Sequence, residues 1–504
     1  MFLAGIAASM AAPPALMVLA DEQPSSEKEV LFRRGVPVGH NQAVKIAIDV
    51  TGQLKLNADG KEVRKLPMQV KGTLEYVERQ LPTVPAPAKA DGKTTAATIG
   101  RWARYYQTAV AKITLAEQPV EQGLREDRRL FAINNEPTAA VLFSPMGPLT
   151  REELELVDIP FGTTQLARLL PKGKVATGVG SSWKLADSDV SALLCLDNVS
   201  QHDLSVTFNE ITGGEAKATL TGKVQGAVAG VSTELEITAN FNYTLAQQQV
   251  TWLSATLQED RAIGHAQPGY SAETKLKVIV ETAESPVEVS DKSLGELPTV
   301  ASIGTTLIDF QSIEANFTLA HDRRWRTMAD SKDLAIMRMV DKGDLIAQCN
   351  ISRQPPLPKG SQLTLEGFQA EIRKNLGKTF GQFVEAGQSV NDRGQRVLRV
   401  LITGMASELP IQWTYYHISD EAGNRAVIVV TLESSLVEKY PALDTQLLAG
   451  FNFTGVPETP PTKSSTAGST SSAPAKKEGE KAEASATPRS ATKPLSPTKI
   501  KSTK

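Results

Sequence analysis

The 504-residue sequence is poor in the residues that usually bind metals or form disulfides, because it has only two cysteines and five histidines. Neither HxxxH nor CxxC occurs, whereas zinc sites usually contain at least one close pair of ligands. We therefore expect no metal and no cofactor. The cysteines, Cys195 and Cys349, are expected to be buried thiols, with a disulfide between two domains as the alternative. The histidines are His40, His202, His265, His321 and His417.

Net charge and catalytic motifs are also lacking. Lys plus Arg is 54 and Asp plus Glu is 56, which gives no overall field to attract nucleic acid. The chain has no GxxxxGK[ST] phosphate loop and no GxSxG nucleophile elbow. GVGSSW, residues 178–183, lacks the third glycine of a dinucleotide site and predicts a tight turn before Trp183. We expect no catalytic residue, no enzyme activity and no nucleic-acid partner.

The only long uncharged run spans residues 2–20 and ends abruptly at the acidic segment that begins at Asp21. Val18 and Ala20 stand at −3 and −1 of this boundary, as a signal peptidase requires. Pro13 and Pro14 interrupt the run, which disfavours a membrane span. Residues 1–20 are thus predicted to be a signal peptide. The protein is expected to be exported, periplasmic or extracellular, without a transmembrane span after cleavage.

Residues 30–282 show a hydrophobic period of two, which predicts long antiparallel strands. In residues 231–245 the large apolar residues occupy odd positions and polar residues lie mostly between them, so one face should be buried and the other wet. Such strands favour a curved half-barrel. Thr150 and Glu153 predict a capping box at the start of a short helix, and Asp187–Leu194 predicts a second one. These helices could close the open side of the sheet.

Residues 283–307 are predicted to be a linker. In residues 308–453, strands are predicted around a helix that is capped by Thr364 and ends at Gly377, and a final helix is predicted from Ser435 toward Gly450. The predicted fold class is therefore α+β, with a curved antiparallel half-barrel first and an antiparallel sheet with two helices second.

The tail, residues 454–504, is rich in Pro, Ser, Thr and Lys and has no aromatic residue after position 455. Such a composition predicts disorder because it offers too little apolar surface to bury. Residues 456–504 contain nine Lys or Arg against four Glu. A solvated spacer is the simpler interpretation, and weak contact with an anionic surface is the alternative.

Two resemblances follow from short sequence stretches. FTLAHDRRW, LEGFQAEI and the C-terminal FNF make residues 312–453 similar to the PsbP-like fold of photosystem assembly proteins and Ran-binding relatives. This resemblance implies a binding or assembly module without a shared catalytic motif. LTREEL, LARLLP and GKVATGVGSSW make residues 30–282 resemble uncharacterised exported planctomycete β-rich domains, which look similar to lipoprotein-carrier half-barrels.

The clearest basic cluster in the folded part contains Arg323, Arg324, Trp325 and Arg326. In the PsbP-like family a Trp at the matching place packs against the sheet, so Trp325 is expected in the core and its flanking arginines in water. Were Trp325 exposed, these four residues would be the best candidate for a binding surface.

The leading functional hypothesis is an exported non-enzymatic protein that binds or assembles with an unknown protein. The alternative is a carrier of lipid or another apolar ligand inside the half-barrel. The second alternative is a hydrolase with dispersed carboxylates, which a sheet face filled by apolar side chains would disfavour.

Overall fold

The protein is mostly β-structure. A computed structural model describes residues 29–57, 63–85, 98–136, 139–173, 176–358 and 361–455. Of these residues, 57% lie in strands and 15% in helical segments. The predicted α+β class, with a two-helix second domain, is therefore wrong. The predicted signal peptide and the tail after residue 455 lie outside the described residues.

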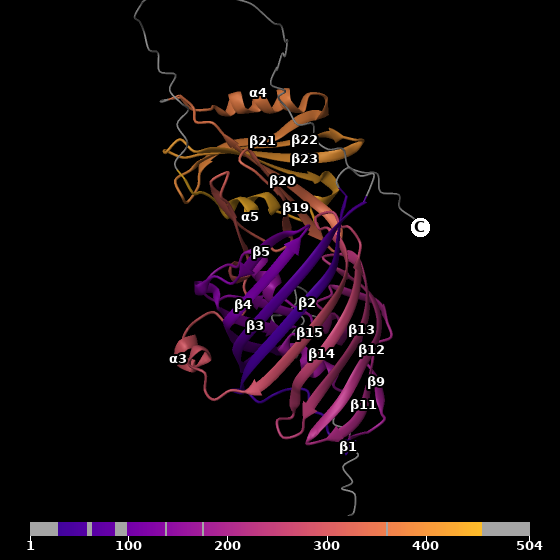
Figure 1. Ribbon diagram of the computed structural model, residues 1–504. Helices are drawn as coiled ribbons and strands as arrows, with labels where there is room; N and C mark the ends of the chain where they lie inside the picture. Colours follow the sequence, from indigo (N-terminus) through magenta and orange to yellow (C-terminus); the bar gives the residue numbers. More distant parts are fainter. Residues whose placement is uncertain are drawn as a thin grey trace, which may run out of the picture.

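The first half of the chain forms one curved, open sheet of thirteen strands (Figure 1). Two meanders meet in its middle, where β2 pairs with β15 along most of its length. The order is β7-β6-β4-β3-β2-β15-β14-β13-β12-β11-β9, with β5 beside β4 and β10 beside β12. The strands are β2 (Asn41–Asn57), β3 (Val63–Pro85), β4 (Thr98–Leu115), β5 (Gln118–Gly123), β6 (Leu130–Asn135), β7 (Ala140–Phe143), β9 (Ser182–Lys184), β10 (Asn198–His202), β11 (Ser205–Thr212), β12 (Glu215–Val228), β13 (Val231–Thr244), β14 (Gln249–Arg261) and β15 (Gly269–Thr282).

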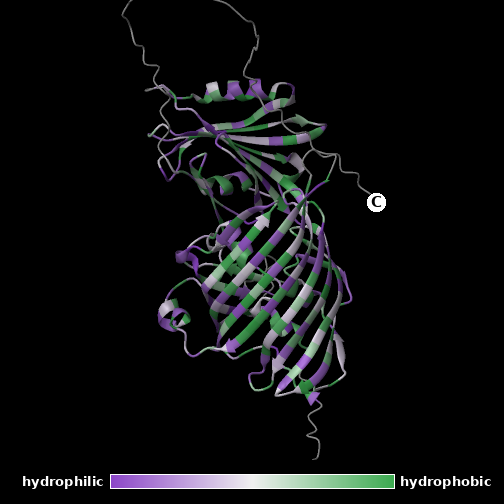
Figure 2. Cartoon of the chain, viewed as in Figure 1, coloured by the Kyte–Doolittle hydropathy of each residue, from purple (hydrophilic) through white to green (hydrophobic). Residues whose placement is uncertain are grey.

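The two faces of this sheet differ as the period of two predicts. Along β13, buried residues alternate with exposed or half-buried ones throughout. Figure 2 shows the same alternation of hydrophobic and hydrophilic segments along the long strands. The convex face is therefore wet, and the concave face supplies the core.

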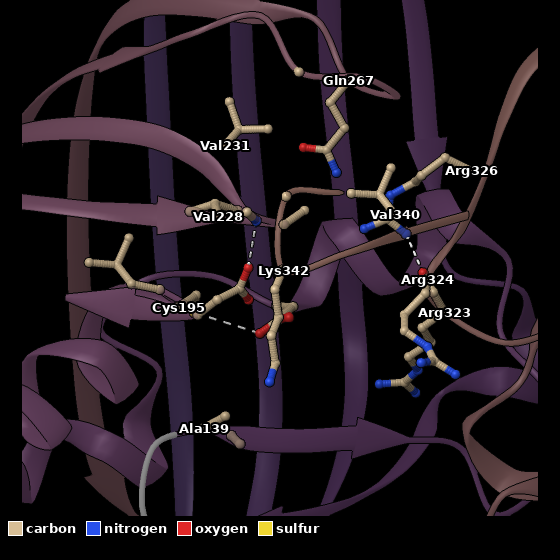
Figure 3. Close-up of a pocket in the computed structure, with 18 of the residues that line it drawn as sticks. Ala139, Cys195, Val228, Val231, Gln267, Arg323, Arg324, Arg326, Val340 and Lys342 are labelled. Atoms are coloured by element: carbon tan, nitrogen blue, oxygen red, sulfur yellow. Dashed lines mark hydrogen bonds between the residues drawn. The ribbon is translucent and has the colours of Figure 1, made fainter. Parts of the chain in front are cut away.

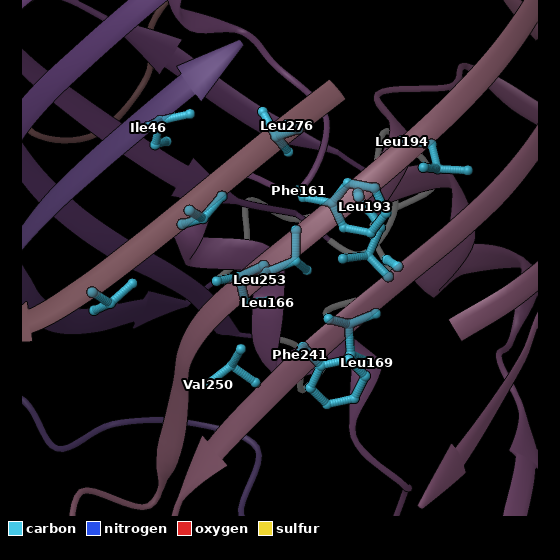
Figure 4. Packing of buried hydrophobic residues seen from close by; sticks show 14 of the residues in the cluster. Ile46, Phe161, Leu166, Leu169, Leu193, Leu194, Phe241, Val250, Leu253 and Leu276 are labelled. Atoms are coloured by element: carbon cyan, nitrogen blue, oxygen red, sulfur yellow. The ribbon is translucent and has the colours of Figure 1, made fainter. Parts of the chain in front are cut away.

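The concave face is filled by the chain itself. The segment between β7 and β10 contains α1 (Arg151–Val157), the 3-10 helix η2 (Thr163–Leu169) and α2 (Asp187–Leu194). Phe161, Leu166 and Leu193 from this segment pack against sheet residues such as Phe241 and Leu253 (Figure 4). Thr150 and Glu153 form the predicted capping box of α1, and α2 has the predicted bounds. The helices thus occupy the space that a carrier would use for an apolar ligand.

The second half forms a seven-stranded antiparallel sheet between two smaller layers (Figure 1). α4 (Leu365–Leu376) packs on the face turned away from the large sheet through Phe368 and Ile372. α5 (Leu443–Ala449) and a three-stranded sheet pack on the other face. The seven strands are β18 (Trp325–Asp330), β19 (Leu334–Asp341), β20 (Asp344–Gln354), β24 (Arg425–Glu433), β23 (Leu409–Ser419), β22 (Arg396–Ala406) and β21 (Phe380–Val390); the small sheet contains β16 (Ile308–Ser312), β17 (Phe317–His321) and β25 (Phe451–Phe453).

α5 is shorter than predicted. It begins at Leu443 rather than at Ser435, because Pro441 cannot continue a helix. Ala442, the residue just before the helix, has a left-handed backbone (φ 58°). At the predicted start of this helix the described structure has a 3-10 turn, η6 (Ser434–Leu436). Because α5 is short and the strands β16, β18 and β25 are present, the second unit contains less helix and more strand than predicted.

The two units contact each other directly. Arg338 Nη1 donates to the carbonyl of His265 at 2.7 Å, and Arg125 forms an ion pair with Asp309 at 3.1 Å. The turn at Gly230 lies so close to the turn at Gly343 that a Cβ on Gly230 would be 1.8 Å from the Gly343 nitrogen. Only glycine fits this contact.

The segment 283–307, predicted to be a linker, packs on the first unit. It contains η3 (Val287–Val289), α3 (Asp291–Leu294) and η4 (Gly304–Thr306), and Val289 and Leu294 are buried against the outer side of the large sheet. Among the described residues, no helix is long and apolar enough to cross a membrane.

Candidate binding site at the junction of the two units

A cavity of about 930 Å³ lies where the C-terminal unit meets one end of the concave face (Figure 3). Its walls come from β6 and β7, from the ends of α1 and α2, from the β12–β13 turn, from the β14–β15 loop and from two C-terminal segments. The polar lining residues include Asp158, Cys195, Asp197, Arg323, Arg326 and Lys342; the apolar ones include Ile133, Leu142, Val157, Ile159, Leu196, Val228, Val231 and Val340. The lining is therefore amphipathic.

The structure splits the predicted basic cluster between core and cavity. Trp325 is 2% exposed and packs in the C-terminal core, as expected from the resemblance. Its side chain is therefore not part of a binding surface. Arg324 is exposed at the edge of the same cavity and pairs with Asp322 at 2.9 Å. Arg323 and Arg326 are half-buried and line the cavity, so the expectation that they lie in water is wrong.

Arg323 and Arg326 are held by backbone carbonyls. Arg323 donates from Nη2 to Leu142 O at 2.6 Å and from Nε to Thr306 O at 2.8 Å. Arg326 donates from Nη1 to Arg323 O at 2.5 Å, whereas its Nε is buried without a hydrogen-bond partner among the described residues. These contacts fix the positions of the guanidinium groups and leave their charges unpaired.

A third arginine, Arg151 at the start of α1, completes the cationic cluster. It donates from Nη2 to the carbonyls of Arg323 at 2.6 Å and Trp325 at 3.3 Å. Within the described part of the chain, no carboxylate lies within 4 Å of a guanidinium nitrogen of these three arginines. Burial, together with the neighbouring charge of Arg326, lowers the pKa of Arg151 to about 9. Burial also lowers the pKa values of Arg323 and Arg326.

The opposite wall of the cavity is acidic. Asp158 follows α1, and its carboxylate accepts a hydrogen bond from Cys195 Sγ at 3.6 Å. Desolvation by the surrounding protein raises the pKa of Asp158, and it raises the pKa of Glu155 one turn earlier, although both side chains are accessible to solvent. Asp197 Oδ2 accepts from the backbone N–H of Gly230 at 3.0 Å. As the pH falls, protonation of Asp158 and Glu155 would leave the arginine charges less opposed.

The two cysteines differ in environment. Cys349 is fully buried, as predicted, and Cys195 is half-buried in the cavity wall. Cys195 ends α2 with a left-handed backbone (φ 54°), which turns it out of the core. Both thiols are free. In the described segments, no three His, Cys, Asp or Glu side chains are grouped in a way that could hold a metal ion.

His417 is a core residue. It is 1% exposed, its ring centroid lies 5.8 Å from that of Phe368, and Arg425 Nε donates to its Nε2 at 3.1 Å. Burial, with the nearby charge of Arg425, lowers its pKa to about 4.

Most cavity residues escaped sequence analysis. Asp158, Cys195, Lys342 and the Gly230 turn come from segments far apart in the chain, and no local motif joins them. Sequence analysis could identify Arg323 and Arg326 only because they lie close together in the sequence.

Comparison with known proteins assigns no family. No protein-family description matches the chain, and no curated protein sequence matches it. The solution structure of PsbP from the cyanobacterium Synechocystis is 11% identical, with 32% of this chain and 99% of that chain covered and a TM-score of 0.24. The Saccharomyces cerevisiae Ran-binding protein Mog1p is 10% identical, with 29% and 95% covered and a TM-score of 0.23.

A structure of lipovitellin that describes lipid–protein interactions is 8% identical. The match covers 69% of this chain and 32% of the lipovitellin chain, with a TM-score of 0.30. The resemblance to the PsbP-like fold is thus supported only weakly. At these TM-scores none of the three likenesses decides the function.

Proposed function

We propose that this protein is an exported, non-enzymatic binding protein that holds an amphipathic, anionic ligand in the cavity at the junction of its two units. The observation that supports this most is the buried Nε of Arg326, which has no partner among the described residues. A buried donor without a partner costs free energy, and more so when it is charged. A ligand oxygen at this place would supply the missing acceptor.

The charge distribution favours an anionic group. Arg151, Arg323 and Arg326 use backbone carbonyls to fix their positions, and their charges have no carboxylate within ion-pair distance in the described residues. A guanidinium binds carboxylate, sulfate or phosphate oxygens through short, charge-assisted hydrogen bonds. Because the pKa values of Asp158 and Glu155 are raised by desolvation, we expect anion binding to tighten as the pH falls.

The apolar lining favours a ligand with a hydrophobic part. Val231, Val340 and Leu142 face the same cavity as the arginines. A volume of about 930 Å³ is within the range of small-molecule sites. The chain itself fills the hollow of the half-barrel, so an apolar ligand would not fit there. If the protein carries such a ligand, the cavity at the junction is the place for it. The apolar filling also argues against a hydrolase cleft across the sheet.

The test uses titration calorimetry of the full chain with three probes: sulfate, n-octyl phosphate and 1-octanol. At constant ionic strength we expect octyl phosphate to bind about tenfold or more tightly than sulfate, because its chain buries apolar area. Arg326→Gln should weaken both anions by about tenfold, the loss of one charge-assisted hydrogen bond. The neutral octanol should not respond to this substitution.

The comparison variant is Arg324→Gln, which removes an arginine that also lines the cavity but whose charge is already paired with Asp322 and Asp341. It should weaken the two anions much less than Arg326→Gln does. Equal sulfate affinity in wild type, Arg324→Gln and Arg326→Gln would show that the anion binds elsewhere and would overturn the proposal. If Arg326→Gln weakens binding of octyl phosphate but not of sulfate, the cavity would still be an apolar site, and the proposed anionic subsite would be wrong.

A further inference from the structure

A second hollow, of about 540 Å³, lies on the sheet formed by β11 to β14, at the end remote from the cavity described above. It is lined mainly by amide, carboxylate and ammonium side chains around the ring of Trp252. The other aromatic residue at the hollow, Phe241, is 1% exposed and packs in the core. Outward residues of β13 such as Glu234, Glu236 and Thr238 are polar, as is typical of a wet face. An indole at this place needs an explanation other than core packing.

Trp252 is half-buried and offers both a ring face and a hydrogen-bond donor. It stands opposite Asn242 on β13 and Ile279 on β15. Its Nε1–H has no acceptor among the described residues, whereas the Nε1–H of Trp183 donates to Leu169 O at 2.9 Å. Buried tryptophans usually satisfy this group, so a free one at the rim of a hollow is available to a ligand.

The polar side chains around Trp252 hold one another in fixed positions. Asn209 Nδ2 donates to Thr219 Oγ1 at 2.7 Å, and Thr219 Oγ1 donates to Asn240 Oδ1 at 2.9 Å. Beside them, Asn242 Nδ2 donates to Glu215 Oε2 at 2.8 Å. Each amide uses one of its groups in these bonds and keeps another free, so the row presents ordered donors and acceptors.

Backbone irregularities form the hollow. The register of β11 against β12 shifts between Phe208 and Glu210, and the register of β13 against β14 shifts between Asn242 and Tyr243. Such bulges bend a strand and change the direction of its side chains. Asn209 is the extra residue of the first shift and lines the hollow.

We propose that this hollow binds a neutral saccharide, with one sugar ring stacked on Trp252 and its hydroxyl groups bonded to the row of amides. A sugar ring has an apolar C–H face and a rim of hydroxyls that donate and accept, which matches an indole beside amides and carboxylates. Lys217 pairs with Glu210 at 2.9 Å, and Glu215 accepts from Asn242. The hollow therefore has no excess of cations that would favour an anionic ligand.

The test measures binding of β-1,4-linked hexasaccharides of glucose and of N-acetylglucosamine to the full chain by calorimetry. We expect at least one of them to bind, and Trp252→Ala to weaken it by about tenfold or more, while Trp252→Phe retains part of the affinity. Ser254→Ala is the matched control, because Ser254 is two residues along the same strand and does not line the hollow. It should bind as wild type does.

A second variant covers the case in which Trp252→Ala does not fold. Asn240→Ala removes an exposed amide of the row and should weaken the same saccharide severalfold with an unchanged melting temperature. If neither hexasaccharide binds the wild-type protein at millimolar concentration, the proposal is wrong. It is equally wrong if binding persists unchanged in Trp252→Ala and Asn240→Ala.

Discussion

Buried arginine occurs in two regions of the molecule with opposite surroundings. Inside the large sheet, where it reaches the wall of the same cavity, Arg104 is 4% exposed, and its Nη2 lies 2.8 Å from an oxygen of Glu78, which is fully buried. It also donates to Tyr106 Oη at 2.9 Å and Thr163 Oγ1 at 3.1 Å. At the junction, Arg326 has one backbone carbonyl and a buried Nε without a partner in the described residues.

The difference separates a structural charge from one that is available to a ligand. Burial opposes the charge of Arg104, but Tyr106, Tyr76 and Glu78 raise its pKa above the ordinary value. At Arg326 burial lowers the pKa, and the nearest carboxylates only partly oppose this effect. Thr163 belongs to η2, so the Glu78 and Arg104 network also ties the inserted segment to the sheet. Among the described residues, the junction arginines have no comparable carboxylate or hydroxyl partner.

The largest change in stability is expected from breaking the buried ion pair of Arg104 and Glu78. Arg104→Leu leaves the carboxylate of Glu78 buried without its counter-ion, which should lower the free energy of unfolding by about 3 to 5 kcal/mol. Urea denaturation measures this. The double variant Arg104→Leu with Glu78→Leu should recover much of the loss, and no recovery would contradict a paired structural role.

The next effect tests the contact between the units. Gly230→Ala places a Cβ against the backbone of Gly343 at a positive φ and should cost about 2 to 4 kcal/mol. Gly213→Ala is the control, since Gly213 has a similar φ of 62° with open space around it. Scanning calorimetry should show a much larger loss for Gly230→Ala. Equal losses would mean that the two turns do not press together.

A third prediction concerns pH and two buried histidines in the C-terminal unit. The pKa values of His321 and His417 are lowered from 6.5 to about 4, mainly by burial. Below 6.5 the unfolded chain takes up protons that the folded chain does not, so this stability is complete above 6.5 and is lost as the pH falls toward 4. Each ring should account for about 2 to 3 kcal/mol of the loss. His417→Leu should flatten the decline, and an unchanged slope would contradict it.

The smallest expected change in stability is at the junction. Arg326→Gln removes a half-buried charge that has no ion-pair partner in the part of the chain that the structure describes, so the free energy of unfolding should change by about 1 kcal/mol or less. Arg104→Gln, in contrast, should be strongly destabilising. If both substitutions destabilise the protein equally, the distinction between the two arginine regions is wrong.

Local signals allowed parts of the fold to be predicted from sequence. α4 has the predicted bounds because Thr364 accepts from Gly367 N at its start and Gly377 ends it in a positive φ. β13 was predicted because its alternation is unbroken. The pattern is less informative in β3, where Glu78, Arg79 and Gln80 interrupt the apolar alternation. Glu78 can lie inside the sheet because Arg104 pairs with it.

The candidate site was predictable only in part, for a related reason. The cluster of arginines at positions 323 to 326 is visible in the sequence, but its burial depends on how the second unit sits on the first. Asp158 and Cys195 end two separate helices, and their proximity follows from tertiary packing alone. The prediction of the fold class was wrong for two reasons. Pro441 shortens α5, and strands as short as β25 contain too few residues to show a hydrophobic period.

The position of a bound anion tests the central claim most directly. In a crystal of the full chain grown with selenate, the selenium can be located by its anomalous scattering. Our account predicts a selenium site in the junction cavity, within hydrogen-bond distance of Arg326 Nε or of Arg323, that is lost in Arg326→Gln crystals. Selenium only at exposed arginines outside the cavity, such as Arg393, would contradict it.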